Sequence, residues 1–348
     1  MRLGFRWFGE GDPVRLAHIR QIPGMRAIVS SLHDLPPGAA WPRDRVARLR
    51  DTVERHGLSL GVIESIPVHE DIKLGRPARD ALIDAWCASL EAVGSEGVPV
   101  VCYNFMPVFD WTRTELARVD DDGALALAYD DAALAAIDLA RGTGDLPGWG
   151  AAYDARALGA LLQAWRAVSA EQLWEHLAYF LERVVPVAAR VGVKLAMHPD
   201  DPPWPIFGLP RIITDGDALV RLTRLVDDPH NGITFCTGSL GAAHADALPA
   251  MVRRVAGRIH FAHCRNVKVT APRVFHESAH PTAYGSVDMY AVLRALHDTG
   301  FDGPMRPDHG RMIWDETGRP GYGLHDRALG ATYLYGLWEA VSRSVDHG

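Results

Sequence analysis

The chain has 348 residues, of which 48% are hydrophobic and 23% charged, which is the composition of an ordinary globular protein. A net charge of −7 without a basic cluster argues against nucleic-acid binding. No apolar run approaches the roughly 20 residues that span a bilayer. The N-terminus has charges within its apolar stretch instead of a signal-peptide core, and the four cysteines form no CxxC pair. We therefore expect a reduced, cytoplasmic protein that binds neither nucleic acid nor membrane.

Strand-like and helix-like segments alternate along the first hundred residues. We expect strands at residues 3–8, 26–30, 58–63 and 98–103, with helices at residues 13–20, 42–56 and 77–93. Pro42 opens the second of these helices and Gly57 follows its end, as is usual for helices. The fourth strand is apolar throughout, which favours a parallel sheet that is covered on both faces.

The alternation stops between Asn104 and Trp165. This segment is rich in Gly, Pro, Asp and Ala, and it is too long for an ordinary loop. An Ala/Leu-rich patch near residues 129–139 predicts a short helix. We interpret residues 104–165 as an insertion that forms a lid or an oligomer contact, and the alternative is a solvated insertion without a function.

The alternation resumes at Ser169, where Ser-Ala-Glu-Gln has the form of a capping box. Further strands are expected at residues 193–198, 232–236, 258–263 and 301–306, and helices at residues 169–191, 215–226, 244–255, 286–298 and 324–342. Eight strand–helix units predict an α/β protein with a (β/α)₈ barrel. We expect residues 1–348 to form a single domain, with the insertion of residues 104–165 after strand 4.

Four strand-like runs in the second half lead to residues that bind metals well. His198, Cys236 and His263 are the last residues of three of them, and Asp308 follows the fourth. The carboxyl ends of barrel strands meet at one mouth, where active sites of this fold lie. We therefore predict that these four residues bind one divalent metal. Cys264 should point the other way along its strand and serve packing.

The predicted donor set is two imidazoles, a thiolate and a carboxylate, which suits zinc or iron. A site that also accepts substrate oxygens at open positions favours Mn²⁺ or Fe²⁺. Such a metal would act as a Lewis acid on a hydroxy acid.

Two further residues are candidates for proton transfer. His309 follows Asp308 directly, so its ring is expected outside the metal's coordination but within reach of a bound substrate. Tyr322 lies in Pro-Gly-Tyr-Gly, a segment with little to pack against, and the alternative is an aromatic that caps a turn.

Four weaker candidates offer groups that grip substrate oxygens, and for each of them an ordinary loop hydrogen bond is an equal alternative. They are Asn104, Arg113, Arg265 and Asn266.

Several long runs make the chain similar to a known family. They are Phe5–Gly9, Val62–Lys73, Val101–Arg113, Met197–Pro203, Phe207–Ile213, Arg306–Arg311 and Pro320–Gly323. In these runs the chain resembles the mannonate dehydratase family of hexuronate catabolism, in its metal-dependent barrel type, and the resemblance covers almost the whole sequence.

The resemblance implies dehydration of D-mannonate to 2-keto-3-deoxy-D-gluconate. It implies one Mn²⁺ or Fe²⁺ ion held by the four residues that the strand-end argument selects. It also implies that His309 and Tyr322 carry out the proton transfers, and that the chain forms a homodimer or a higher homo-oligomer.

Three alternatives remain open from the sequence. The substrate could be another aldonate, or the chain could be a metal-dependent sugar isomerase. Such isomerases tend to have carboxylate-rich sites with two metals, unlike the thiolate-containing set here. A non-catalytic sugar-acid sensor is the third alternative, although binding alone needs neither His309 nor Tyr322.

Overall fold

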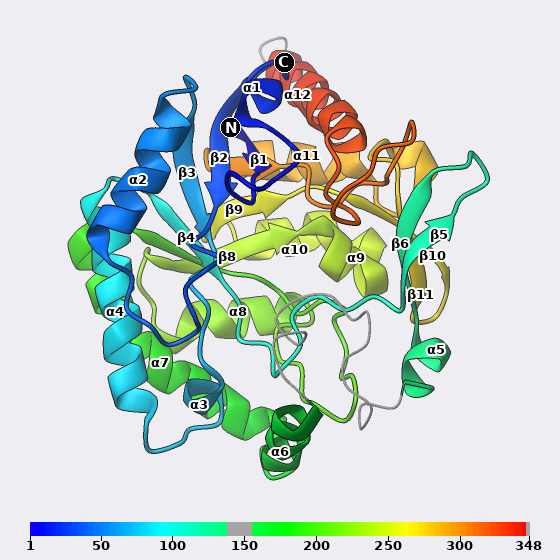
Figure 1. Ribbon diagram of the computed structural model, residues 1–348. Helices are drawn as coiled ribbons and strands as arrows, with labels where there is room; N and C mark the ends of the chain where they lie inside the picture. The colour runs from blue at the N-terminus through cyan, green and yellow to red at the C-terminus, as the bar shows by residue number, and fades with distance from the viewer. Residues whose placement is uncertain (138–154, 346–348) are drawn as a thin grey trace.

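The core of the protein is a closed barrel of eight parallel strands (Figure 1). The computed structural model describes residues 1–137 and 155–345. Neighbouring strands follow one another in chain order, and the last strand pairs with the first. The predicted (β/α)₈ barrel is therefore confirmed. Its strands are β1 (Arg2–Arg6), β2 (Met25–Ser30), β3 (Ser59–Glu64), β4 (Val100–Tyr103), β7 (Lys194–Met197), β8 (Asn231–Cys236), β9 (Ile259–His263) and β12 (Pro304–Arg306).

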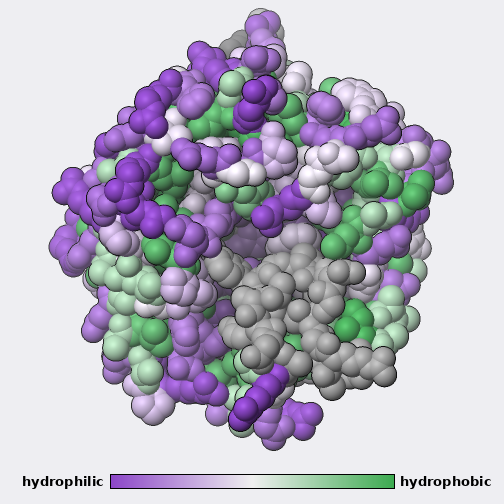
Figure 2. Space-filling model, viewed as in Figure 1, coloured by the Kyte–Doolittle hydropathy of each residue, from purple (hydrophilic) through white to green (hydrophobic). Residues whose placement is uncertain are grey.

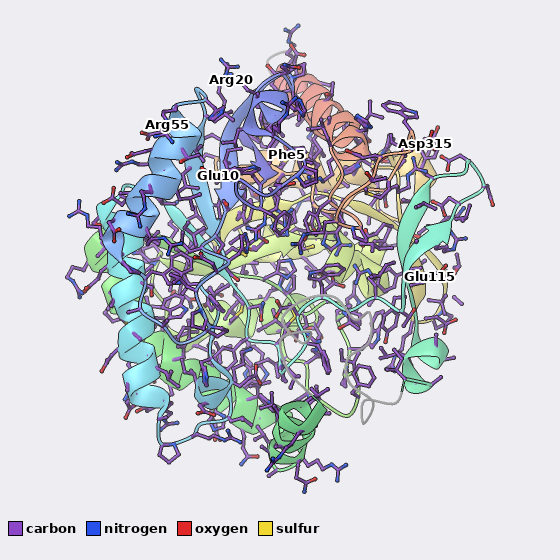
Figure 3. All side chains as sticks on the ribbon, viewed as in Figure 1. Phe5, Glu10, Arg20, Arg55, Glu115 and Asp315 are labelled. Atoms are coloured by element: carbon purple, nitrogen blue, oxygen red, sulfur yellow. The ribbon has the colours of Figure 1, made fainter. Side chains whose placement is uncertain are left out.

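Helices surround the barrel, with α2, α4, α7 and α12 clearly outside it in Figure 1. The capping box at Ser169 is present, and Gly192 ends the same helix with a left-handed backbone conformation. Figure 3 shows exposed Arg20 and Arg55 at the outer rim and the buried Phe5 inside. The helices are α1 (Leu16–Ile19), α2 (Arg43–Glu54), α3 (Glu70–Lys73), α4 (Arg79–Ser95), α5 (Asp131–Ala135), α6 (Ala155–Trp165), α7 (Ala170–Val191), α8 (Gly216–Leu225), α9 (Thr237–His244), α10 (Leu248–Arg254), α11 (Met289–Asp298) and α12 (His325–Val345).

Apolar side chains, most of them small or branched, fill the inside of the barrel beneath its mouth. They form a separate buried cluster of Val29, Val62, Val100, Cys102, Ala196 and Phe261. The Phe261 ring packs edge-on against the His263 ring, with centroids 4.6 Å apart. The apolar interior therefore supports one of the predicted metal ligands from below.

A second sheet, which the sequence analysis missed, lies beside the barrel (Figure 1). Two of its strands follow β4 and two follow β9, so two distant excursions of the chain pair with each other. We call it the accessory sheet. Its strands, in the order β10-β11-β6-β5, are β5 (Glu115–Val119), β6 (Leu125–Asp130), β10 (Asn266–Ala271) and β11 (Val274–Ser278).

Two predicted helices were partly wrong. Tyr129 and Asp130 end strand β6, so the helix expected near residues 129–139 is reduced to α5, and residues 138–154 lie outside the described part. The helix expected at residues 244–255 is preceded by α9, because a helix begins directly after Cys236. Two glycines lower the helix propensity of α9, so the sequence does not predict this helix. Burial against the barrel compensates for the low propensity.

Candidate active site

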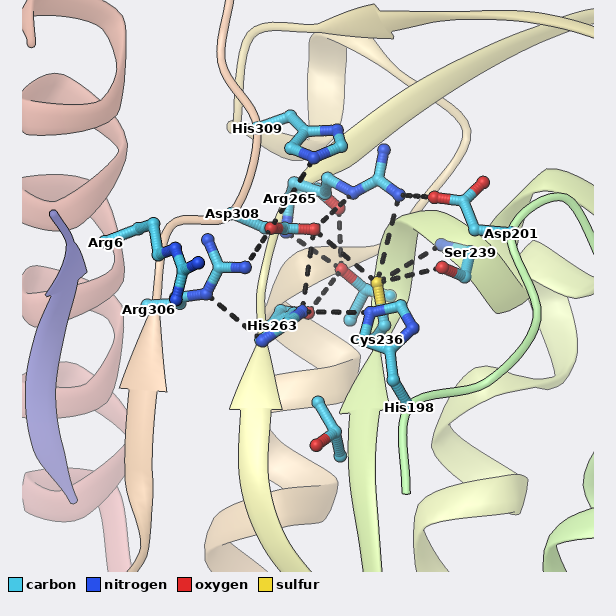
Figure 4. Close-up of polar contacts among 12 residues, drawn as sticks. Arg6, His198, Asp201, Cys236, Ser239, His263, Arg265, Arg306, Asp308 and His309 are labelled. Carbon is cyan, nitrogen blue, oxygen red and sulfur yellow. Dashed lines mark hydrogen bonds and ion pairs between the residues drawn. The ribbon is translucent and has the colours of Figure 1, made fainter. Parts of the chain in front are cut away.

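The four predicted metal ligands lie together at the mouth of the barrel (Figure 4). Ligand atoms of His198, Cys236 and His263 all lie within 4.8 Å of one another. One Asp308 oxygen lies 3.7 Å from the Cys236 sulfur and 3.7 Å from His263 Nδ1. They come from the ends of β7, β8, β9 and β12, as the strand-end argument predicted.

The Cys236 sulfur lies at the start of helix α9. It accepts hydrogen bonds from the Ser239 backbone N–H at 3.4 Å and from the Ser239 hydroxyl at 3.2 Å. The first turn of this helix therefore fixes the position of the sulfur at the mouth of the barrel. Helix α9 is therefore part of the site.

The two histidines are oriented by their outer nitrogens. His198 Nδ1 donates to the Pro199 carbonyl at 2.6 Å, so its Nε2 faces His263 Nδ1 at 3.2 Å. On the other side of its ring, His263 Nε2 lies 3.3 Å from a Glu64 oxygen and 3.1 Å from Arg306 Nε. Two ring nitrogens that face each other this closely are arranged for a shared cation, with outer partners that fix the rings.

The charges around the cluster set the protonation of its members. Burial, reinforced by the Arg306 guanidinium, lowers the pKa of His263 well below its ordinary value. Burial opposes the ionisation of Asp308, but Arg306 and the other groups around it together outweigh burial and hold the pKa of this carboxyl well below its usual range. Burial also opposes the charged form of His198, but Cys236, Asp308 and Glu64 together outweigh it and raise its pKa to about 9. A bound cation would take the place of that proton.

The donor set fits a divalent transition metal. Two imidazoles, a thiolate and a carboxylate are ligands that zinc and iron accept, and four protein ligands leave room for substrate oxygens at an octahedral ion. The residues that the structure describes therefore include a group of side chains that can hold the predicted metal ion.

His309 and Tyr322 face each other beside this cluster. His309 Nε2 lies 2.9 Å from the Tyr322 hydroxyl, and the Trp111 ring lies 4.7 Å from the His309 ring, centroid to centroid. Burial lowers the pKa of His309 and raises the pKa of Tyr322 to about 12. At neutral pH the pair therefore combines a neutral imidazole with a protonated phenol.

The segment that carries Tyr322 is anchored on both sides. The Gly310 backbone N–H donates to the Gly321 carbonyl at 2.9 Å. From α12, the buried Arg327 donates to the carbonyls of Tyr322 and Gly323. The glycine-rich segment is thus held against the residues that follow β12.

Two of the weaker candidates, Arg113 and Arg265, belong to a buried ion-pair network. Arg113 pairs with Asp201 at 2.8 Å and with Glu277 at 2.7 Å. Arg265 pairs with Asp201 at 2.6 Å, with Asp308 at 2.7 Å and with Glu277. Neither arginine lines the cavity described below.

The two asparagines have different surroundings. Asn104 lines the cavity, where its amide donates to Asp110 at 3.3 Å. Asn266 is buried, and its side chain bonds to the backbone of Pro281 and Val287. The structure therefore places Asn104, but not Asn266, at the cavity that a substrate would enter.

A cavity of about 350 Å³ opens over the cluster. Figure 2 shows a hollow near the middle of this face, with hydrophilic residues around it. Several of its charged residues were not predicted from the sequence, although three of them also lie at strand ends. Arg6, Glu64 and Arg306 are the last residues of β1, β3 and β12. The cavity is lined by Arg6, Phe8, His33, Glu64, Asn104, Asp110, Trp111, His198, Asp201, Arg306, Asp308, His309, Arg319 and Tyr322, among others.

Residues 1–347 match the family described as D-mannonate dehydratase (UxuA). The chain belongs to this family. It is 56% identical to mannonate dehydratase 2 of Halalkalibacterium halodurans over 98% of this chain and 100% of that protein. It is 53% identical to the mannonate dehydratase of Streptococcus uberis over 99% of this chain and 100% of that one.

A solved structure supports the assignment to the D-mannonate dehydratase family. The crystal structure of mannonate dehydratase from Streptococcus suis serotype 2 has a TM-score of 0.92 and 47% identity, and covers 99% of this chain and 96% of that one. A xylose isomerase domain protein from Planctomyces limnophilus, with a TM-score of 0.56 and 14% identity, covers 98% of each chain and shares the fold alone. Among the described residues, no helix is both long and apolar enough to cross a membrane.

Proposed function

We propose that this D-mannonate dehydratase binds one Mn²⁺ or Fe²⁺ ion through His198, Cys236, His263 and Asp308. The reaction is the dehydration of D-mannonate to 2-keto-3-deoxy-D-gluconate. The observation that carries the metal proposal is the convergence of these four ligands at the strand ends, with the two ring nitrogens 3.2 Å apart. The hard oxygen atoms of a hydroxy acid favour Mn²⁺ or Fe²⁺ over an ion restricted to four ligands.

The chemical difficulty of the reaction is loss of the proton on C2. This proton is only weakly acidic, and its removal increases negative charge on the neighbouring carboxylate. When bound, the metal supplies Lewis acidity that stabilises this charge where it develops. Arg306 lines the same cavity, and its guanidinium adds positive charge near the metal ligands.

We assign the two proton transfers to His309 and Tyr322. One removes the C2 proton and the other protonates the departing C3 hydroxyl, after which the enol becomes the 2-keto product. The hydrogen bond between His309 and Tyr322 supports this assignment, because it joins a proton acceptor to a proton donor at the cavity wall. Well-positioned groups of this kind typically contribute about 10² to 10⁴-fold each.

We also propose that the chain acts on a free small sugar acid in the cytoplasm, as a homodimer or higher homo-oligomer. Cys236 and the other three cysteines are free thiols, which suits a reducing compartment. Light scattering on the purified protein would measure the oligomer size. A monomer at working concentration would contradict the oligomer.

A turnover assay tests the function. The protein is stripped of metal, reloaded separately with Mn²⁺, Fe²⁺ or Zn²⁺, and supplied with D-mannonate, with the 2-keto-3-deoxy product as the readout. We expect product with Mn²⁺ or Fe²⁺ and none from the stripped protein. Aldonates epimeric at C2 and C3 serve as comparison substrates. No product from D-mannonate with any metal, in folded and metal-loaded protein, would contradict the proposal.

A further inference from the structure

Glu277, on strand β11 of the accessory sheet, contacts His309 from the side opposite to Tyr322. Its Oε1 lies 3.3 Å from His309 Nδ1, and both side chains are buried. The other ring nitrogen of His309 faces the Tyr322 hydroxyl at 2.9 Å. The imidazole is therefore held between a carboxylate and a phenol.

The Glu277 carboxylate is itself fixed by the arginine network. Arg113 and Arg265 both donate to the same oxygen that faces His309, and Asp201 binds the other side of these two guanidiniums. Burial opposes ionisation of Glu277, but Arg265 and Arg113 outweigh it and lower its pKa to about 2. The group beside His309 is thus a carboxylate at neutral pH, and it can only accept a hydrogen bond.

We propose that Glu277 is a positioning residue that accepts the Nδ1–H of His309 and so keeps Nε2 turned toward Tyr322 and the cavity. This inference rests on the proposed role of His309 in proton transfer. A carboxylate that fixes the ring and tautomer of a histidine acts through that histidine and needs no contact with the substrate.

The accessory sheet supplies other supports for the same segment. Leu125 on β6 forms a two-way backbone bridge with Met312, with N···O distances of 2.9 and 2.8 Å. Leu127 on β6 lies against Gly321, next to Tyr322. The sheet that holds Glu277 therefore also contacts the segment between His309 and Tyr322 near both of its ends, which connects this sheet to the active site.

The first test compares Glu277→Gln with Asp201→Asn. Each change removes one negative charge from the same pair of arginines, but only Glu277 contacts His309. For Glu277→Gln we expect kcat to fall about 10- to 100-fold, as for other groups that orient a functional histidine, while KM and metal content stay near those of the wild type. Asp201→Asn should lower kcat less. Equal losses in the two variants, or a loss confined to KM or metal content, would overturn the proposal.

Combination with His309→Asn gives the decisive readout. If Glu277 acts through His309, adding Glu277→Gln to His309→Asn should change kcat by less than threefold, a small part of its effect in the wild type. Full additivity of the two losses would overturn the proposal, because a merely structural role persists without the histidine. If Glu277→Gln does not fold, Glu277→Asp takes its place, because the shorter side chain keeps the charge but moves the carboxylate oxygen away from His309.

The two proposals fail in different ways. Near-normal turnover of His309→Asn would contradict the proposed role of His309 itself. A strong loss in His309→Asn together with unchanged kcat in Glu277→Gln would contradict only the role of Glu277.

Discussion

The pair to which we assign the proton transfers shows how neighbouring residues set the protonation of a side chain. His309 and Tyr322 are joined at 2.9 Å, and burial shifts both pKa values in the direction that keeps the imidazole neutral and the phenol protonated. Neither residue belongs to the proposed set of metal ligands, so the pair can be changed without removing a proposed ligand. Metal binding and proton transfer can therefore be tested separately.

We predict that His309→Asn and Tyr322→Phe each lower kcat by about 10² to 10⁴-fold, because each removes one proton-transfer group. Both variants should still bind one equivalent of metal, since neither residue belongs to the ligand cluster. Steady-state kinetics and metal analysis on the same samples would check this. Near-normal turnover of either variant would show that its assigned role is wrong.

At the scale of elements, the segment from Gly310 to Gly323 is held in place by α12 and by β6. Gly321 has a φ of +78°, and a Cβ there would lie 2.5 Å from Leu127 Cδ1 on β6. Both the backbone conformation and the close approach of β6 therefore require glycine next to Tyr322.

Gly321→Ala and Gly257→Ala form a matched pair. Gly257 has the same φ of +78° but nothing within 4 Å of its Cβ position, and it precedes β9 away from the cavity. Each change should lower the free energy of unfolding by about 1–2 kcal/mol through the left-handed backbone. Only Gly321→Ala should also lower kcat, because Leu127 pushes the neighbouring Tyr322 away. Unfolding curves and kinetics measure both effects, and equal kcat in the two variants would contradict this account of the segment.

Some of these elements could be predicted from the sequence and others could not. Periodicity and strand ends located the barrel and brought His198, Cys236, His263 and Asp308 to one mouth, because parallel strands of one barrel must end together. The partners of Arg265 and His309 could not be predicted in this way. They depend on Glu277, which lies on a sheet formed by two excursions distant in sequence. The sequences of β5 (ELARV) and β6 (LALAYD) are short, and apolar and polar residues do not alternate in them.

At the scale of the whole molecule, the barrel buries titratable side chains among apolar ones. One of them, His260, lowers the stability of the fold in acid. His260 on β9 is buried, and its Nδ1 lies 2.7 Å from the Leu195 carbonyl. Among the described residues, its Nε2 has no hydrogen-bond partner. Burial lowers the pKa of His260 from 6.5 to about 4.

This shift predicts a loss of stability below neutral pH. The unfolded chain binds a proton at His260 first, so the folded state loses stability as the pH falls from about 6.5 to about 4 and is unaffected by this group above that range. The loss amounts to about 3 kcal/mol at most. The difference in unfolding free energy between the wild type and His260→Asn should shrink by that amount between pH 7 and pH 4. Denaturation curves at both values measure it, and a constant difference would contradict the prediction.

Metal binding by two cysteine variants would show whether the residues at the strand ends hold the metal. Cys236 and Cys264 are both buried free thiols near the mouth, but only Cys236 belongs to the ligand cluster. We expect the wild type and Cys264→Ala to bind one equivalent of Mn²⁺ and to turn over D-mannonate. Cys236→Ala should bind Mn²⁺ at least about tenfold more weakly, because it loses a thiolate ligand. Equal affinity and turnover in the two variants would show that the metal does not bind at the predicted strand ends.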